Sequence, residues 1–343
     1  MAISNRTRKI VKIGKRTIGD RSPVFIVAET GTNHNGNIEV AIKMIEAAKR
    51  CGADAVKFQT IDADASYIKD TLPYNIYKHM KFTLNDWKRL KKAALQNNII
   101  FFSAPADVLS VDIFKAVKLP VIKISSGSMT NIALVRRMAK LKIPVMISTG
   151  MSYLSEVKMV VSEFERRGVK DLIIFHCTSL YPAGPDQLNL NAIKVLRESF
   201  SYPIGYSDHT RSDLPSVAAI CLGARVVEKH FTIDRNIGGP EQSFSYSAVE
   251  LKRLVDNIRY IEKTLGDLKK SPSPKEFGVR DKYRRCLIAE TDIKKGQIIG
   301  RDIVGMKRPL VKPGLSTAYF EKVIGKKSKK NIKKNFPIYS DCV

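Results

Sequence analysis

Short runs of Val, Ile and Phe recur along the first two thirds of the chain, and each is followed by polar or turn-forming residues. Within a run the apolar residues are nearly continuous, which is typical of strands in a parallel sheet that is covered on both faces. We expect eight strands of this kind. They span residues 24–30, 55–60, 99–105, 121–126, 144–150, 172–178, 203–209 and 226–232.

Between these runs, apolar residues recur at helical spacing, clearly so in 38–52, 84–98, 132–142, 154–168 and 248–266. Eight strands alternating with helices predict an α/β fold, a (β/α)8 TIM barrel. An open, doubly wound sheet is the alternative, but no G-x-G-x-x-G motif follows the first strand.

The pattern changes after Gly266, where Ser, Pro and charged residues predict a linker over residues 268–283. Short strand-like runs and turns follow over residues 284–343 and predict a small, mostly β domain. The expected organisation is therefore a catalytic barrel over residues 1–267, the linker, and the C-terminal domain.

The chain carries 59 Lys and Arg against 33 Asp and Glu, a net charge of +26. This excess of positive charge is compatible with a protein that binds nucleic acid through a basic surface. The basic residues are spread along the chain, however, and neither zinc-finger spacing nor an aromatic ribonucleoprotein motif is present. We therefore expect no nucleic-acid partner, and the positive field favours a small anionic substrate.

The five cysteines, at positions 51, 177, 221, 286 and 342, form no C-x-x-C motif, which favours a reducing compartment. The basic N-terminus lacks the apolar segment of a secretory signal, and no apolar run is long enough to span a membrane. We expect a cytoplasmic protein without a membrane partner.

Candidate chemistry lies at the carboxyl ends of the predicted strands, where barrel enzymes place their active sites. Lys57 and Lys123 alternate with apolar neighbours and should point into the barrel, where an ammonium group is costly without an anion. With serine hydroxyls at nearby strand ends they predict a site for a phosphate-bearing substrate.

His209 and His230 close two consecutive strands, so their imidazoles should lie side by side at one rim. Two imidazoles with carboxylates suit a divalent metal such as Mn²⁺. Glu29, Glu228 and Asp208 are near enough in the predicted fold to strengthen this expectation.

A series of short strings runs in order along the chain from about residue 20 to 340. They are AETGTNHNG (28–36), KFQT (57–60), KISSGS (123–128), STGM (148–151), HCTSLYP (176–182), GYSDHT (205–210), EKHFT (228–232), GGPEQSFS (238–245), DIKKGQ (292–297) and KRP (307–309). Taken together, these strings resemble the sialic acid synthase family. The resemblance implies a (β/α)8 barrel followed by an antifreeze-like (SAF) domain.

The resemblance also implies an enzyme that joins phosphoenolpyruvate to an N-acetylated amino-sugar aldehyde, giving a nine-carbon sialic-acid-type sugar and phosphate. It implies a domain-swapped homodimer in which Arg308 reaches the partner's barrel. Mn²⁺ is the preferred metal, with Mg²⁺ or Co²⁺ as alternatives, held by His209 and His230. The residues implied to contact phosphoenolpyruvate are Lys57, Gln59, Lys123, Ser126, Ser148 and Ser207. Those implied to contact the sugar are Glu29, Ser179, Tyr181, Glu241 and Arg308. The implied catalytic residues are Glu29, Lys57, Lys123, His209, His230 and Glu241.

This chain departs from the family pattern at four positions. Glu241 stands where the family usually has Asp, Ser128 replaces an acidic residue, and Ala104 replaces a hydroxyl residue. Ser179 stands where N-acetylneuraminate synthases often carry Asn and where members that make diamino sugars often have Ser. The expected activity is that of an N-acetylneuraminate synthase, with a legionaminate or pseudaminate synthase as the alternative.

A related possibility is an enzyme that uses phosphoenolpyruvate to make seven- or eight-carbon keto sugar acids. The small C-terminal domain and the NHNG loop at 33–36 argue against it.

Overall fold

The computed structural model describes residues 9–267 and 269–343. The chain divides into two compact units, Met1–Gly266 and Asp267–Val343. Each is described here by itself.

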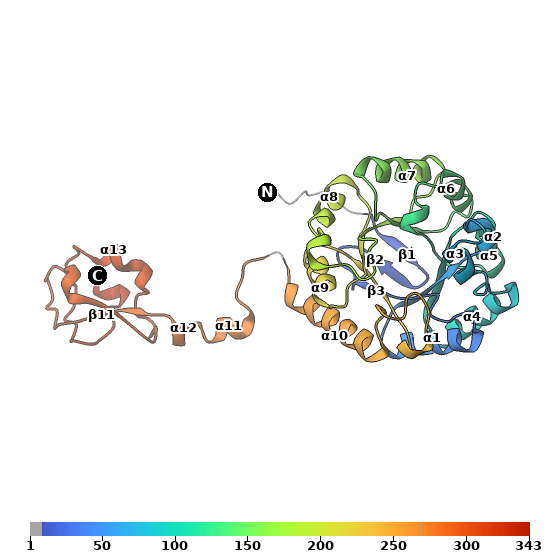
Figure 1. The fold of residues 1–343 in the computed structure, drawn as a ribbon. Helices are drawn as coiled ribbons and strands as arrows, with labels where there is room; N and C mark the ends of the chain where they lie inside the picture. Colours follow the sequence, from blue (N-terminus) through green and yellow to red (C-terminus); the bar gives the residue numbers. More distant parts are fainter. Residues whose placement is uncertain (1–8, 268) are drawn as a thin grey trace. The chain divides into compact units, whose positions relative to one another are not determined.

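The first unit is a closed barrel of eight parallel strands, surrounded by helices (Figure 1). Its strand order is β10-β3-β4-β5-β6-β7-β8-β9, which excludes an open sheet and confirms the predicted (β/α)8 barrel. The strands are β3 Phe25–Gly31, β4 Ala55–Thr60, β5 Ile100–Pro105, β6 Ile122–Ile124, β7 Val145–Ser148, β8 Leu172–Cys177, β9 Ile204–Asp208 and β10 Val226–His230.

The helices of this unit include five that the sequence pattern did not single out. All five, α2, α3, α5, α8 and α9, have eight residues or fewer, and α9 is also so apolar that its helical periodicity is weak. The helices are α1 Ile38–Arg50, α2 Ala63–Ser66, α3 Leu72–Tyr77, α4 Leu84–Gln96, α5 Val111–Val117, α6 Ile132–Ala139, α7 Leu154–Arg166, α8 Ala192–Ser199, α9 Leu214–Cys221 and α10 Ala248–Leu265, with 3-10 turns at Ser126–Ser128, Pro185–Gln187 and Arg235–Ile237.

Successive side chains of each strand point alternately out of and into the barrel, so the apolar core has two layers. Outward residues such as Ile26 and Val56 pack against the helices. Inward residues near the strand starts, such as Phe25 and Phe102, pack against a hairpin formed by β1 Val11–Ile13 and β2 Arg16–Ile18. The hairpin therefore covers the amino-terminal end of the barrel (Figure 1). The polar groups are left to the carboxyl end.

The second unit is small and built mainly from short β segments, as predicted. Its strands β11 Cys286–Ala289 and β12 Val304–Lys307 pair in antiparallel fashion over a core that includes Leu287, Ile299 and Ile338. Two short helices, α11 Pro274–Gly278 and α12 Arg280–Tyr283, occupy most of the predicted linker. The unit is completed by α13 Phe320–Val323 and by 3-10 turns at Arg301–Ile303, Thr317–Tyr319 and Ser340–Cys342.

Candidate active site

Two lysines and two glutamates meet inside the barrel at its carboxyl end. Lys57 Nζ lies 2.7 Å from Glu29 Oε2 and 3.4 Å from Glu228 Oε1, and Lys123 Nζ lies 2.6 Å from the same Glu228 oxygen. The Ser207 hydroxyl also donates to Glu228 Oε1, at 3.0 Å. All five side chains are buried, so the predicted inward lysines are balanced by carboxylates of the protein itself.

The strand register explains why these residues converge. Glu29 pairs with Lys57 across β3 and β4, and His230 pairs with Glu29 across β10 and β3. Because side chains alternate along a strand, Glu228 and His230 share the inner face while Lys229 points the other way. The EKH string thus places two groups in the site and one behind it.

The cluster separates the two glutamates electrostatically. Burial raises the pKa of Glu29 above its usual value, and Lys57 only partly offsets this. Burial also acts on Glu228, but the adjacent Lys123 and Lys57 lower the pKa of its carboxyl below its usual range. Glu228 is therefore held ionised, while Glu29 is the carboxyl more able to carry a proton, an arrangement suited to acid–base chemistry.

The two predicted imidazoles lie next to each other, with ring centroids 5.4 Å apart. His209 Nδ1 donates to the Thr178 carbonyl at 2.6 Å, which leaves Nε2 as the ring nitrogen with a lone pair. Burial, helped by the neighbouring His230, lowers the pKa of His209 to about 3, so its ring is neutral at physiological pH. The Tyr181 ring packs on His209, with centroids 4.3 Å apart.

This pair fits part of a metal site. His230 Nδ1 is buried without a hydrogen-bond partner, and the nearest carboxylate, Glu241 Oε2, is 3.6 Å away. Within 9–267 and 269–343, no group of three His, Cys, Asp or Glu side chains could enclose a metal ion. His209 and His230 could supply two nitrogen ligands, and the remaining ligands would have to be water or substrate oxygens.

A polar niche adjoins the lysines at the ends of β6, β7 and β8. The Gly150 amide donates to Ser126 Oγ at 3.0 Å and to Cys177 Sγ at 3.1 Å. A Cβ on Gly150 would collide with Ser179 Oγ, which is buried and has no hydrogen-bond partner. Ser148, the last residue of β7, is also buried here. Unpartnered hydroxyls beside buried lysines favour an anionic ligand.

Glu241 approaches the site from the segment after β10. Its Oε2 accepts a hydrogen bond from the Thr32 amide at 3.2 Å. Gly31 has a positive φ of 50°, and a Cβ at this position would collide with that carboxylate. The longer side chain at position 241 is thus accommodated by the glycine that ends β3. His230 lowers the pKa of Glu241 against the opposing effect of burial.

The structure places most predicted site residues at one rim. Gln59 joins them by donating to Glu29 Oε1 at 3.2 Å. Arg308 is exposed in the second unit, so its predicted role stays a prediction. The residues brought to the carboxyl end of the barrel are Glu29, Lys57, Gln59, Lys123, Ser126, Ser148, Ser179, Tyr181, Ser207, His209, His230 and Glu241.

Two features differ from the sequence-based expectation. Asp208 does not face the imidazoles but points outward, where it pairs with Lys229 at 3.0 Å. Glu228, expected only as a nearby carboxylate, is the centre of the charge cluster. The stacked rings of Tyr67 and Tyr77, with centroids 5.1 Å apart, were not predicted. Burial, and after it the negative charge of Glu241, raises the pKa of both phenols.

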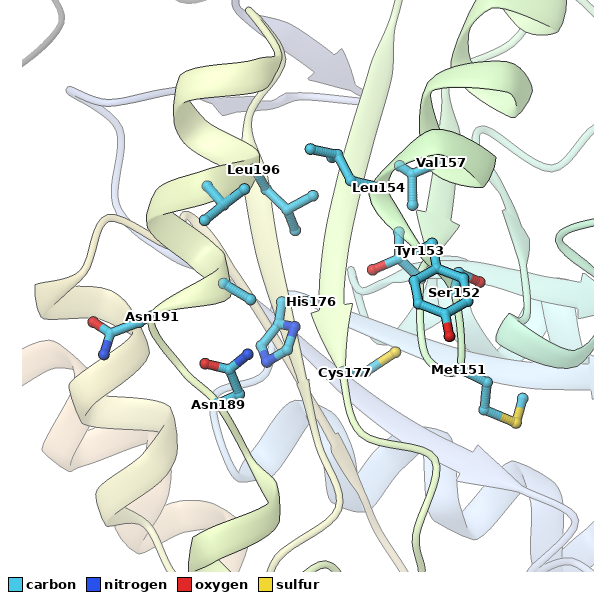
Figure 2. Close-up of a pocket in the computed structure, with 13 residues that line it drawn as sticks. Met151, Ser152, Tyr153, Leu154, Val157, His176, Cys177, Asn189, Asn191 and Leu196 are labelled. Carbon is cyan, nitrogen blue, oxygen red and sulfur yellow. The ribbon is translucent and has the colours of Figure 1, made fainter.

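A cavity of about 610 Å³ lies beside this site, between α7 and α8 (Figure 2). It is lined by apolar residues such as Leu154 and Leu196 and by His176, whose Nε2 is bonded to the Leu188 carbonyl oxygen. Cys177 lines the cavity and also borders the polar niche. None of the lysines, glutamates or imidazoles of the charge cluster lines it.

Comparison with known proteins agrees with this architecture. The model of the NeuB family matches residues 44–270, and that of the SAF domain matches residues 284–343. An uncharacterized protein of Methanocaldococcus jannaschii is 40% identical over 331 residues, covering 96% of this chain and 98% of that protein. The N,N′-diacetyllegionaminic acid synthase of Campylobacter jejuni is 38% identical over 327 residues, covering 91% of this chain and 97% of that enzyme.

Among solved structures, the chain resembles the N-acetylneuraminic acid synthetase of Leptospira borgpetersenii serovar Hardjo-bovis in complex with citrate. The TM-score is 0.76 at 33% identity, and the match covers 80% of this chain and 96% of that one. No helix in the described parts of either unit is long and apolar enough to cross a membrane.

Proposed function

The chain belongs to the NeuB family of phosphoenolpyruvate-dependent nonulosonate synthases, which are transferases, and on this premise we propose what its site does. The enzyme condenses phosphoenolpyruvate with the open-chain aldehyde of an N-acetylated amino sugar. The products are a nine-carbon keto sugar acid and inorganic phosphate.

One observation carries this proposal: two buried lysines and several serine hydroxyls converge at the carboxyl end of the barrel. Lys57 and Lys123 lie on either side of Glu228 Oε1, within 3.4 Å and 2.6 Å of it. These ammonium groups can donate charged hydrogen bonds to the phosphate or the carboxylate of phosphoenolpyruvate. The phosphoenolpyruvate ligands are Lys57, Gln59, Lys123, Ser126, Ser148 and Ser207.

In the reaction, C3 of phosphoenolpyruvate forms a bond to the aldehyde carbon of the sugar. Water adds at C2, and the bond between C2 and the phosphate oxygen then breaks. The proton of the new C2 hydroxyl leaves with the phosphate, and C2 becomes the keto carbon. Lys57 and Lys123 stabilise the charge on the departing phosphate. Glu29 accepts a proton from the attacking water at its carboxylate, since its raised pKa suits proton transfer, and that proton ends on the former aldehyde oxygen.

When bound by His209 and His230, a divalent cation, with Mn²⁺ preferred and Mg²⁺ or Co²⁺ as alternatives, would polarise the aldehyde oxygen as a Lewis acid. The neutral His209 ring is ready to ligate without losing a proton. The rings of Tyr181 and Phe244, with centroids 5.3 Å apart, shield the imidazole side of the site from solvent.

Ser179, Tyr181, Glu241 and Glu29 are the proposed sugar contacts in the barrel. N-acetylmannosamine is one candidate sugar, and a diamino sugar of the legionaminate or pseudaminate series is the other. Ser179 and the similarity to the Campylobacter jejuni enzyme favour the diamino sugar. A short hydroxyl at position 179 leaves more room than an amide would, which suits a second acylated nitrogen.

The test is phosphate release from phosphoenolpyruvate with a panel of N-acetylated hexosamines and diacetamido sugars. We expect release only when both a sugar and a divalent cation are present, and faster release with a diacetamido sugar than with N-acetylmannosamine. Full activity after exhaustive chelation would remove the metal from the proposal. Equal release with every aldehyde, or none with any, would contradict the proposed substrate class.

A further inference from the structure

An unusual ion pair lies directly behind the two imidazoles, on the outer face of β9 and β10. The Lys229 side chain is 1% exposed, and its Nζ lies 3.0 Å from Asp208 Oδ2. Asp208 is equally buried, and its carboxylate also accepts hydrogen bonds from Ser216 Oγ at 2.6 Å and the Thr210 amide at 2.9 Å. The pair faces the surrounding helices and touches no substrate position.

The ammonium group of Lys229 holds the backbone on both sides of His209. It pairs with Asp208, the residue before His209, and donates at 2.7 Å to the carbonyl of Thr210, the residue after it. A longer bond, 3.3 Å, reaches the Ser212 carbonyl. Lys229 itself precedes His230, so one side chain links the main chain at both imidazoles.

Apart from Asp208 and the two backbone carbonyls, the surroundings of Lys229 are apolar. The aromatic face of Tyr246 lies 4.3 Å from Lys229 Nζ, and the neighbouring layer is filled by residues such as Ile220 and Leu251. Burying an ion pair costs several kcal/mol of desolvation per ion, and apolar replacements of similar volume are often no less stable. Stability alone therefore gives no reason to place a lysine here, whereas a requirement for one fixed backbone geometry does.

We propose that Lys229, together with Asp208, is a positioning residue that fixes the His209 and His230 rings at the separation needed to share one divalent cation. The inference rests on the proposed function, in which these two imidazoles hold that cation. Groups that hydrogen-bond directly to metal ligands typically change metal affinity by tenfold to a hundredfold when they are removed. Lys229 acts on the two imidazoles through the backbone that carries them.

The experiment measures Mn²⁺ affinity directly, from the electron paramagnetic resonance signal of free Mn²⁺, on full-length protein whose folded fraction is matched by circular dichroism. The variants are Lys229→Met, which keeps the length of the side chain without its charge, and His209→Ala, which removes a proposed ligand. Arg253→Met is the matched control, because Arg253 pairs with Asp213 in the same helical layer, and Asp213 lies outside β9 and β10.

We expect Lys229→Met to weaken Mn²⁺ binding by about tenfold or more, His209→Ala to abolish it, and Arg253→Met to leave it unchanged. If Lys229→Met binds Mn²⁺ like the wild type while His209→Ala does not, the inference is wrong and the proposed metal site stands. Equal weakening in Arg253→Met would also overturn it. If the wild type binds no Mn²⁺, or His209→Ala binds it normally, the metal site itself fails and the inference with it.

A second variant covers the case in which Lys229→Met does not fold because Asp208 is left buried and unpaired. The double variant Asp208→Asn/Lys229→Met removes both charges. The amide oxygen at position 208 can keep the hydrogen bond from the Thr210 amide, and the amide nitrogen can donate to the Ser216 hydroxyl. The double variant should fold, since no buried charge is left alone. The same loss of Mn²⁺ affinity is expected, and wild-type affinity in the folded double variant would refute the positioning role.

Discussion

Glu228 is the residue that organises the site at atomic scale. Its Oε1 receives both lysines and the Ser207 hydroxyl, whereas its Oε2 is buried without a hydrogen-bond partner. Glu228 Oε2 is therefore free to accept a hydrogen bond inside the barrel. The two lysines hold Glu228 ionised against the effect of burial, whereas burial raises the pKa of Glu29. The two adjacent carboxyls can therefore have separate roles.

Replacing Lys57 or Lys123 by Met tests the anion site. Each variant should bind phosphoenolpyruvate about tenfold to more than a hundredfold more weakly, because a charged hydrogen bond is worth about 1.5–3 kcal/mol. Titration calorimetry on folded protein measures this, with Lys88→Met on the exposed face of α4 as control. Wild-type affinity in both lysine variants would mean that phosphoenolpyruvate binds elsewhere.

Gly31 and Glu241 should be coupled. Gly31→Ala costs roughly 1–2 kcal/mol of folding stability for the left-handed backbone. It also forces a Cβ against the Glu241 carboxylate, and the displacement of that carboxylate should lower turnover. Adding Glu241→Asp withdraws the carboxylate and should restore part of the loss. Steady-state kinetics of both single variants and the double variant provide the comparison, and strictly additive effects would disprove the coupling.

At the scale of elements, the strands were predictable because each is a buried apolar run, and the barrel followed from their alternation with helices. Lys57 and Lys123 could be assigned to the interior from alternation alone. Alternation also places Asp208 outward, between the inward Ser207 and His209, but its partner Lys229 is distant in sequence and could not be inferred. The role of Glu228 was missed for a similar reason, since its partners come from β4 and β6.

Glu163 links the outer helices α6 and α7, and its ion pairs predict how stability changes with pH. It accepts hydrogen bonds from Arg136 on α6 and from Arg166 and Arg167 at the end of α7. The bonds from Arg136 and Arg167 lower the pKa of Glu163 from 4.5 to about 2. A lowered folded-state pKa means that the stabilisation is complete above pH 4.5 and is lost as the pH falls through about 2.

The measurement is the urea midpoint of wild type and Glu163→Gln as a function of pH. The wild type should be the more stable at neutral pH, and the difference should shrink between pH 4.5 and about 2. A difference that is constant over this range would show that the carboxylate does not titrate as described.

The barrel and the second unit, Asp267–Val343, which contains the SAF domain, each have their own apolar core. Arg308 is an exposed basic residue of this SAF unit. A site that releases phosphate from a charged intermediate gains from a cover that excludes water. We propose that a second copy of the chain supplies this cover through Arg308 in a homodimer.

Complementation tests the assembly. Arg308→Ala and Lys123→Met subunits should each have little activity alone, and mixed dimers should regain one working site from an intact barrel and an intact SAF unit. Phosphate release after the subunits are exchanged reports the recovery, and mixing two Lys123→Met preparations is the control. No recovery from dimers shown to be mixed would exclude action of Arg308 on the partner.

We propose that this barrel joins phosphoenolpyruvate to an amino-sugar aldehyde, and that the bond between C2 and the phosphate oxygen is the one that breaks. The most direct measurement uses phosphoenolpyruvate labelled with ¹⁸O at the oxygen that bridges C2 and phosphorus, together with a diacetamido sugar and Mn²⁺. Mass spectrometry of both products should find an unlabelled nine-carbon keto acid and phosphate that carries the label. A nine-carbon product that retains the label, or phosphate release without such a product, would contradict the account.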